Sequence, residues 1–307
     1  MFKNTQFLRR SIHSLTVVVA LGIAVSSARA QPSGDWSAVE QALGRHGLAQ
    51  PGGVMRFGFP RSDLRVTVGD LQLLPAFALG GWVAFRPEGS SATMMGDLVL
   101  TENEVNAVAD RLRQGGVTVT AVHNHLTGES PHVLYAHIHG HGDAAHLAET
   151  VHAALAKTQT PLEQPPAVTP VRIDLDTATI AKILGASGRV NGGSYQVGIP
   201  RARPIIEGGK PLPPAMGVAT AINFQPTGGN KAAVTGDFVM TASEVPRVQQ
   251  ALRENHIEIT ALHSHMLDEE PRLFFMHFWA VDDAATLARG LRAALDRMAV
   301  KHSAERQ

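Results

Sequence analysis

Histidines occur in two regularly spaced pairs near the middle of the chain. His123 and His125 lie two residues apart, as do His137 and His139, and residues with this spacing point to the same face of a β-strand. The turn-rich segment Thr127 to Pro131 between them predicts a hairpin. With the turn centred on Pro131, His125 faces His137 and His123 faces His139, at Cβ separations of about 4.5–5.5 Å. The spacing predicts a patch of four imidazoles that can share one ion.

The same pattern recurs 140 residues later. His263, His265 and His277 repeat three of the four histidines, and Trp279 stands where His139 stood. Neutral imidazole is the commonest protein ligand for zinc, copper, iron and nickel, and a catalytic zinc site takes three protein ligands. Each copy therefore predicts a site for a divalent transition metal, with zinc as the first candidate.

Carboxylates accompany both histidine segments. Glu129 and Glu269 stand in the turns, as candidates for a fourth ligand or for the general base of a metal-dependent enzyme, with Glu270 as an alternative in the second copy. Asp97 and Asp237 each follow a glycine at a predicted turn, and a role at the histidine site is a further alternative. A purely structural role, in which buried histidines stabilise the hairpins, also stays open.

The first 30 residues have the features of an export signal. Lys3, Arg9 and Arg10 precede the apolar run Leu15 to Val25, and Ala28-Arg29-Ala30 is a cleavage motif. The run is shorter than the roughly 20 apolar residues that span a bilayer. We therefore predict a cleaved signal peptide over residues 1–30 and a periplasmic or secreted protein. The general secretory route (Sec) is favoured over the twin-arginine route (Tat) that the Arg9-Arg10 pair also suggests.

Composition narrows the classes of function. The chain has 307 residues, 44% hydrophobic and 18% charged, with 27 basic and 27 acidic side chains. Residues 1–30 contain four basic and no acidic residues, so the mature chain has a net charge of −4. This balance gives no support for nucleic acid as a partner. The chain has no cysteine. Disulfides and a lipidated cysteine are therefore excluded, and we expect no stable membrane anchor.

A repeat with an offset of 140 residues covers the mature chain. Gly96-Asp97 matches Gly236-Asp237, and Glu104 matches Glu244, in addition to the histidines. A period this long is typical of duplicated domains rather than of solenoid repeats. We predict a first domain over residues 31–157, a Pro-rich linker over residues 158–170 and a second domain over residues 171–307.

The hydrophobic pattern predicts the same elements in each copy. In the first copy, strands are expected over residues 81–86 and 93–100. A helix that begins with a Thr101–Glu104 capping box comes next. The histidine hairpin and a last helix over residues 144–156 follow. This order predicts an α+β fold of two α/β-sandwich domains, with helices packed on one face of antiparallel sheets. Arg61 and Arg201 are expected to form ion pairs within the fold.

The histidine face of the predicted sheet is partly apolar. Val117, Val119 and Ala121 have the same strand parity as His123 and His125. An apolar face is normally covered. We therefore expect a recessed site, buried either between the two domains or under the Pro-rich loop of the second copy.

The histidine segments also resemble those of a known family. TAVHNHLTGESP and YAHIHGHGD in the first copy, and TALHSHMLDEEPRLFFMHFW in the second, resemble the LppY/LpqO family of bacterial envelope proteins. The resemblance covers essentially the whole mature chain and implies a duplicated domain without an established activity, with an envelope component or a small molecule as its partner. Ser264 departs from the family, which usually has asparagine there. The predicted function is metal binding, with a metal-dependent hydrolase of the envelope as the alternative.

Overall fold

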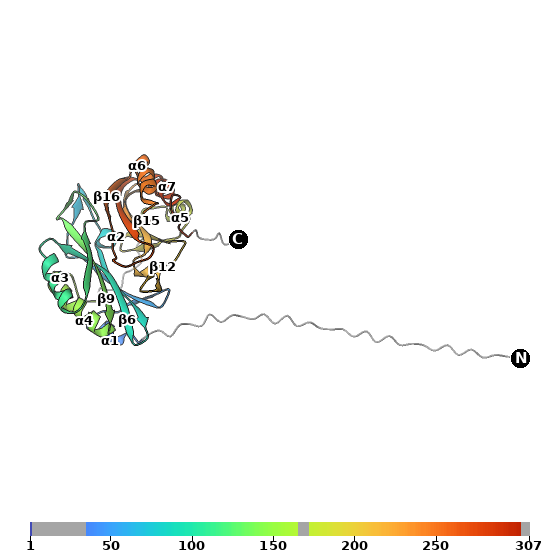
Figure 1. Ribbon diagram of the computed structural model, residues 1–307. Coiled ribbons are helices and arrows are strands. Elements are labelled where there is room, and N and C mark those ends of the chain that lie inside the picture. The colour runs from blue at the N-terminus through green and yellow to red at the C-terminus, as the bar shows by residue number, and fades with distance from the viewer. Residues whose placement is uncertain (2–34, 165–171, 302–307) are drawn as a thin grey trace. The chain divides into compact units, whose positions relative to one another are not determined.

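The computed structural model describes Met1, residues 35–164 and residues 172–301 (Figure 1). Apart from Met1, the predicted signal peptide falls outside these residues, as do residues 165–170 of the predicted linker. Both repeats belong to one compact unit. Within the described ranges, no helix combines the length and the apolar character needed to cross a membrane.

The first repeat is built on a six-stranded antiparallel sheet. In spatial order, its strands are β1 (Leu48–Gln50), β2 (Val54–Pro60), β5 (Gly80–Glu88), β6 (Ser91–Thr101), β9 (Val133–Gly142) and β7 (Thr118–His123). Helices α1 (Ser37–Leu43), α3 (Val105–Gln114) and α4 (Ala144–Leu155) cover one face (Figure 1). Leu43, Val108 and Val151 of these helices pack with Leu98 and Ile138 of the sheet in one buried cluster.

The second repeat has the same architecture. Its sheet contains, in spatial order, β10 (Arg189–Asn191), β11 (Ser194–Pro200), β14 (Ala219–Gly228), β15 (Lys231–Thr241), β17 (Leu273–Asp283) and β16 (Glu258–His263). Helices α5 (Thr177–Leu184), α6 (Val245–Glu254) and α7 (Ala284–Leu295) pack on one face through residues such as Leu184, Leu252 and Leu291. The predicted α+β fold with a duplicated antiparallel sheet is confirmed.

Short elements connect each repeat to the other. The first repeat adds helix α2 (Pro75–Ala78) and a small sheet of β3 (Thr67–Val68), β4 (Leu71–Gln72) and β8 (Glu129–Ser130). The second adds the hairpin β12 (Ile205–Glu207) to β13 (Lys210–Leu212) and the 3-10 helix η1 (Pro214–Met216). Asn223 Nδ2 donates to the Phe77 carbonyl of α2 at 3.0 Å, and Arg56 donates to the Ala215 carbonyl of η1 at 2.8 Å. Each repeat therefore holds a connecting element of the other.

The sheet faces that the helices leave free pack against each other. Because side chains alternate along a strand, Leu98 and Leu100 of β6 point to the helices, whereas Val99 points to the opposite face. One buried cluster on that face joins Val54 and Met95 of the first repeat to Val239 and Phe275 of the second. A second cluster joins Val99 and Tyr135 to Ala233. The layers therefore run helix, sheet, sheet, helix, and the histidine faces lie in the middle.

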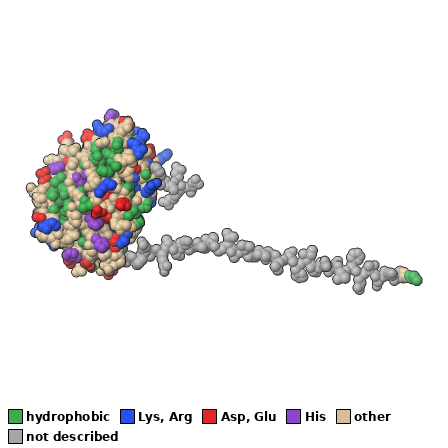
Figure 2. Space-filling view, viewed as in Figure 1, with side chains coloured by type: hydrophobic (Ala, Val, Ile, Leu, Met, Phe, Trp, Pro, Cys, Tyr) green, Lys and Arg blue, Asp and Glu red, His purple; other side chains and the backbone are tan. Residues whose placement is uncertain are grey.

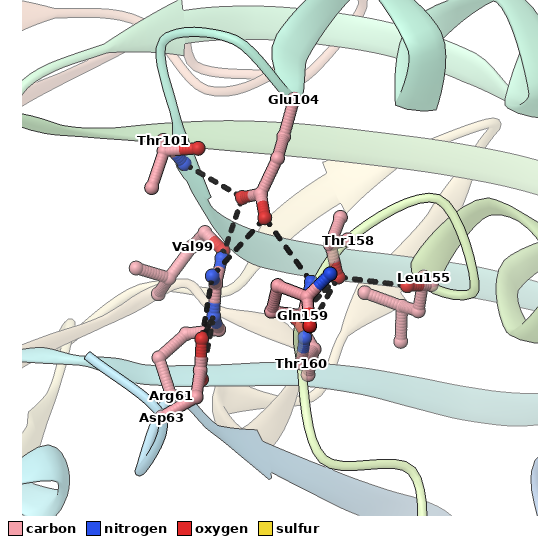
Figure 3. A network of polar contacts seen from close by, with 9 residues as sticks. All are labelled: Arg61, Asp63, Val99, Thr101, Glu104, Leu155, Thr158, Gln159 and Thr160. Carbon is pink, nitrogen blue, oxygen red and sulfur yellow. Dashed lines mark hydrogen bonds and ion pairs between the residues drawn. The ribbon is translucent and has the colours of Figure 1, made fainter.

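The predicted capping box forms only in part. Helix α3 begins at Val105, not at Thr101, and the Glu104 carboxylate accepts the Thr101 N–H at 2.8 Å. The same carboxylate accepts a hydrogen bond from buried Arg61 at 2.7 Å and from the Gln159 N–H at 3.2 Å (Figure 3). The Glu104 side chain thus joins three segments of the chain and makes no capping hydrogen bond to helix α3. Arg61 therefore pairs within the fold, as expected.

The second repeat contains the same buried ion pair. Arg201 donates to Glu244 at 2.8 Å and to the Val239 carbonyl at 2.7 Å. Glu244 also accepts the N–H groups of Thr241 at 2.7 Å and Ala299 at 2.8 Å. Burial would raise the pKa of Glu244, but the hydrogen bonds from Arg201 and from these two N–H groups outweigh it and lower the pKa to about 2.

We expect Glu244→Gln to lower the free energy of unfolding at pH 7 by about 3 kcal/mol, because it leaves Arg201 buried without a counter-charge. A lowered folded pKa means that the stabilisation is complete above the ordinary glutamate pKa and is lost as the pH falls towards about 2. The difference between wild type and variant in urea unfolding should therefore shrink from pH 5 downwards. Glu258→Gln, at an exposed position, serves as the control. A difference that stays constant down to pH 3 would contradict this assignment.

Candidate metal centre

Six histidines, three from each repeat, meet between the two sheets. Their rings form three stacked pairs, each with one member from each repeat. The ring centroids are 3.5 Å apart for His123 and His263, 3.8 Å for His125 and His277, and 3.5 Å for His137 and His265. The expected burial between the two domains is therefore confirmed, and the two copies form one shared centre. We call this group the six-histidine centre.

The six-histidine centre has pseudo-two-fold symmetry. Adding 140 to His123 gives His263, its own stacking partner. The same offset relates His125 to His265 and His137 to His277. The stacked pair of His125 and His277 therefore exchanges with the stacked pair of His137 and His265. The axis therefore passes between His123 and His263. This is the self-complementary arrangement of a symmetric dimer interface, contained here within one chain.

Reciprocal hydrogen bonds fix the two histidine loops against each other. The Thr120 hydroxyl donates to the His265 carbonyl at 2.6 Å, and the Thr260 hydroxyl donates to the His125 carbonyl at 2.5 Å. These bonds are equivalent under the 140-residue offset. Each loop is thus positioned by a side chain of the opposite repeat, and neither half of the centre is held by its own repeat alone. The threonines recur in the sequence, but only the fold reveals what they contact.

One buried and one half-buried carboxylate lie beside the imidazoles. Asp97 on β6 pairs across the sheet with His137 on β9, so their side chains share a face. Its oxygens lie 3.9 Å from His137 Nε2 and 4.0 Å from His125 Nε2. In the second repeat, an Asp237 oxygen lies 3.9 Å from His265 Nε2. The prediction of a turn at these aspartates is wrong, because both lie inside long central strands. The alternative that placed them at the histidine site agrees with this geometry.

The predicted hairpin register is wrong. His123 pairs with Tyr135, and His137 pairs with Ala121. The shift arises at the connection to β9, a long loop whose Glu129–Ser130 segment pairs with β3 instead of closing a tight hairpin. A bulge between Val119 and Ala121 shifts the register by one further residue at His139.

His139 lies outside the six-histidine centre. It has the parity of His137 on β9, but it pairs with Met95 and Thr118 farther along the sheet. Its Nε2 lies 3.3 Å from a carboxylate oxygen of Glu207 on β12. Other histidines, His132, His141 and His146 among them, are exposed, and histidine side chains are visible at the surface in Figure 2.

The two predicted glutamates have other partners. Glu129 is buried on β8, with Oε1 2.7 Å from His132 Nδ1. Glu269 is buried and accepts the Leu273 N–H at 2.8 Å, beside Arg272. Among the described residues, neither belongs to the groups of ligand atoms that lie within 4.8 Å of one another. Their catalytic role stays a prediction.

Burial keeps the imidazoles in the form that binds metals. Burial, reinforced by neighbouring imidazoles, holds the pKa of His125, His137, His265 and His277 well below the ordinary value. Burial also lowers the pKa of His123 to about 4 and that of His263 to about 3. All six are therefore neutral near pH 7, and a neutral imidazole has a free lone pair for a cation.

The carboxylates respond to burial in the opposite sense. Burial raises the pKa of Asp97 to about 7, against the lowering effect of the Arg56 guanidinium. Burial and the charge of Asp97 raise the pKa of Asp237 well above the ordinary value. A cation between these groups would restore the charged form of both carboxylates.

Hydrogen bonds orient two of the imidazoles. His277 Nδ1 lies 2.8 Å from the Gly236 carbonyl, and His123 Nδ1 lies 3.0 Å from the Asn124 carbonyl. A carbonyl only accepts, so Nδ1 bears the proton in both rings and Nε2 presents its lone pair to the centre. This is how histidine ligands of metals are commonly held.

The ligand-type atoms of the centre are left without hydrogen-bond partners. Within the described part of the chain, this applies to Nε2 of His123, His125, His137 and His277, to Nδ1 of His263, and to Oδ1 of Asp97 and Asp237. Two groups of these donors converge, with ligand atoms within 4.8 Å of one another: His123, His125 and His137, and His123, His263, His265 and His277.

Comparison with known proteins identifies the repeated domain. The family described as "Domain of Unknown Function (DUF1259)" matches residues 37–157 and, a second time, residues 178–297. The chain belongs to this family. Its two copies of the DUF1259 domain each contribute three histidines to the centre. The resemblance to the LppY/LpqO family stays a prediction, and no curated protein matches the chain significantly.

Three solved structures are weakly similar to this DUF1259 protein. The double ringed trimeric shell protein MSM0271 from the RMM microcompartment is 14% identical, and the match covers 68% of this chain and 84% of that protein. The trimeric bacterial microcompartment shell protein PduB is 11% identical, with 81% of this chain and 89% of that protein covered. EtuB from Clostridium kluyveri is 11% identical, with 82% of this chain and 90% of that protein covered. Each TM-score is 0.20, which is too low for the likeness to bear on fold or function.

We expect Gly236→Ala to destabilise the protein by about 2 kcal/mol or more, because overpacking at a rigid position moves the backbone. A Cβ at Gly236 would lie 2.0 Å from the Ala221 carbonyl oxygen, and the strand shift would displace the carbonyl that orients His277. Gly198→Ala in β11 of the same sheet is the matched control, since its Cβ would meet nothing within 4 Å. Urea unfolding should separate the two variants. Equal stability would contradict the tight packing around Gly236.

Proposed function

We propose that this DUF1259 protein binds a divalent transition metal at the six-histidine centre. One observation carries the proposal: the described residues leave five imidazole nitrogens and two carboxylate oxygens of the centre without a hydrogen-bond partner. An unsatisfied buried polar atom costs about 1–3 kcal/mol. A protein that gathers so many of them at one point, on rings kept neutral by burial, is organised for a cation.

The donor chemistry selects the class of metal. Imidazole suits zinc, copper, iron and nickel, and the two carboxylates are compatible with the same ions. Thiolate ligands are excluded because the chain has no cysteine. Zinc is the first candidate, because it accepts nitrogen and oxygen ligands without a strict geometric preference. The ligands that we assign are His123, His125, His137, His263, His265 and His277, with Asp97 and Asp237 beside them.

A metal-dependent hydrolase is the second candidate. The observation that favours it is the position of Asp97, which lies beside two imidazoles and has an oxygen without a hydrogen-bond partner among the described residues. A carboxylate near a bound metal can accept a proton from metal-bound water. In this reading Asp97 takes the role that the sequence suggested for Glu129. The purely structural alternative does not account for the unpartnered nitrogens, because histidines that only stabilise the fold would have hydrogen-bond partners.

Metal binding can be tested directly on purified protein. After treatment with chelator and dialysis, we expect zinc to bind at submicromolar concentration, as measured by elemental analysis, and to raise the unfolding temperature. Replacing His137 and His277 together by alanine should weaken zinc binding at least about 100-fold, because each half loses one of its ligands. The control is His146→Ala, which alters an exposed side chain on α4. The proposal fails if wild-type protein binds no metal and shows no thermal shift.

We also propose that the protein is exported to the periplasm or beyond it. The support is the basic start, the apolar run and the Ala28-Arg29-Ala30 motif of residues 1–30. Mass spectrometry of the exported protein should therefore find Gln31 as its first residue. Replacing Arg9 and Arg10 by lysine should leave export unchanged if the general secretory route is used. Retention of Met1 in all of the protein recovered from cells would contradict the proposal.

A further inference from the structure

The imidazoles of the centre are arranged in two layers. Within the first repeat, the His123 ring lies 5.2 Å from His125 and 5.0 Å from His137, measured between centroids. Within the second repeat, the His263 ring lies 4.8 Å from His265 and 4.9 Å from His277. The planes in these four pairs differ by 9° to 29°. Each repeat thus contributes an array of three rings whose planes are nearly parallel.

The two arrays lie face to face. The three stacked pairs that join them have centroid separations of 3.5 to 3.8 Å and interplanar angles of 17° to 26°. The nitrogen lone pairs of an imidazole lie in the plane of its ring. The donor atoms of His123, His125 and His137 lie within 4.8 Å of one another, so their lone pairs can meet at one ion. The donor atoms of His263, His265 and His277 satisfy the same condition in the other layer.

The number of donors is too large for one ion. Six imidazoles and two carboxylates surround the centre, whereas zinc in proteins takes about four ligands and related transition metals up to about six. The converging donors also divide between the repeats. One group holds His125 and His137 of the first repeat, and the other holds His265 and His277 of the second. Among the described residues, only His123 belongs to both groups.

We propose that the six-histidine centre is a two-metal site, with one ion in the plane of each histidine array. The first ion is held by His123, His125 and His137, with Asp97 as the neighbouring carboxylate. The second is held by His263, His265 and His277, with Asp237 in the equivalent place. This inference rests on the proposed function and adds the number of ions and their arrangement about the pseudo-two-fold axis.

The layer spacing agrees with known two-metal chemistry. Ions in the two planes would be separated by about the stacking distance of the rings, and metals in two-metal enzymes are about 3.5–4 Å apart. Such a pair binds a water or hydroxide between its ions and clamps the oxygens of a substrate. The class of ligand is therefore a small oxygen donor shared by both ions.

A small cavity adjoins the two layers. It has a volume of about 10 Å³ and is lined by His137 and His265, one from each array, together with Thr120, Trp82 and Met216. A cavity of roughly 10–15 Å³ accepts one water molecule. The space therefore fits a single water or hydroxide next to both arrays, and it excludes a larger molecule without movement of Trp82 or Met216.

The inference predicts two equivalents of metal per chain. Elemental analysis of purified wild-type protein, loaded with zinc and freed of excess metal, should give two zinc ions. Loading with cobalt(II) or copper(II) should give a magnetically coupled signal in electron paramagnetic resonance. His137→Ala and His277→Ala occupy equivalent positions in the two arrays, and each should lower the stoichiometry from two to one and abolish the coupled signal. The double variant should bind at least about 100-fold more weakly.

His139→Ala is the matched control, since His139 lies on the same strand as His137 but outside both arrays. It should retain two equivalents and the coupled signal. Saturation of wild type at one equivalent, without coupling, would overturn the two-metal site while leaving the proposed function intact. Absence of any bound metal would overturn both. The wild-type stoichiometry decides between these results even if an alanine variant fails to fold, and His137→Gln then replaces it.

Discussion

The stacking of three neutral imidazoles from each repeat determines how the two sheets meet. Each of these rings stacks on an imidazole of the other repeat, and because polar rings on a buried sheet face are costly without hydrogen-bond partners, their placement depends on how the two sheets pack. The hydroxyls of Thr120 and Thr260 complete the match by donating to the carbonyls of the opposite histidine loops. A sliding or rotation of one sheet would break the ring pairs and both hydrogen bonds together, so the position of the histidines and the packing of the repeats are one constraint.

The duplication explains why such a centre is stable. Each sheet has one face covered by helices and one apolar face that contains histidines. A single repeat would expose that face to water, and an isolated array of three imidazoles would lack the groups that orient its loop. Pairing two copies within one chain buries both faces and closes the interface on itself, as in a two-fold dimer. Because the copies are covalently joined, the assembly does not depend on protein concentration.

The repeat, the strands and the helices could be predicted from the sequence, but the contacts between distant elements could not. The 140-residue offset, strand parity and helix spacing correctly predicted the duplicated α+β fold and the shared face of the histidines, since these depend on local periodicity. The register was not predictable, because the bulge after Val119 and the pairing of Glu129 with the distant strand β3 are set by tertiary contacts. The Gly96-Asp97 pair is typical of a turn, but the structure places it inside strand β6. The sequence left open whether the two histidine segments form one centre or two, because the residues that complete each half lie more than 100 positions away in the sequence.

The two halves of the centre are similar in their donors but not in their surroundings. Arg56 of the first repeat stabilises the charged form of Asp97, whereas the matching position of the second repeat is Gln196, which has no charge. Tyr135 stacks on His125 at 3.3 Å, and Phe275 takes its place beside His265 at 3.6 Å. These neighbours set the charge balance around each array. The two arrays therefore have the same donor types beside different groups, so the pseudo-symmetry of the fold does not extend to its electrostatics.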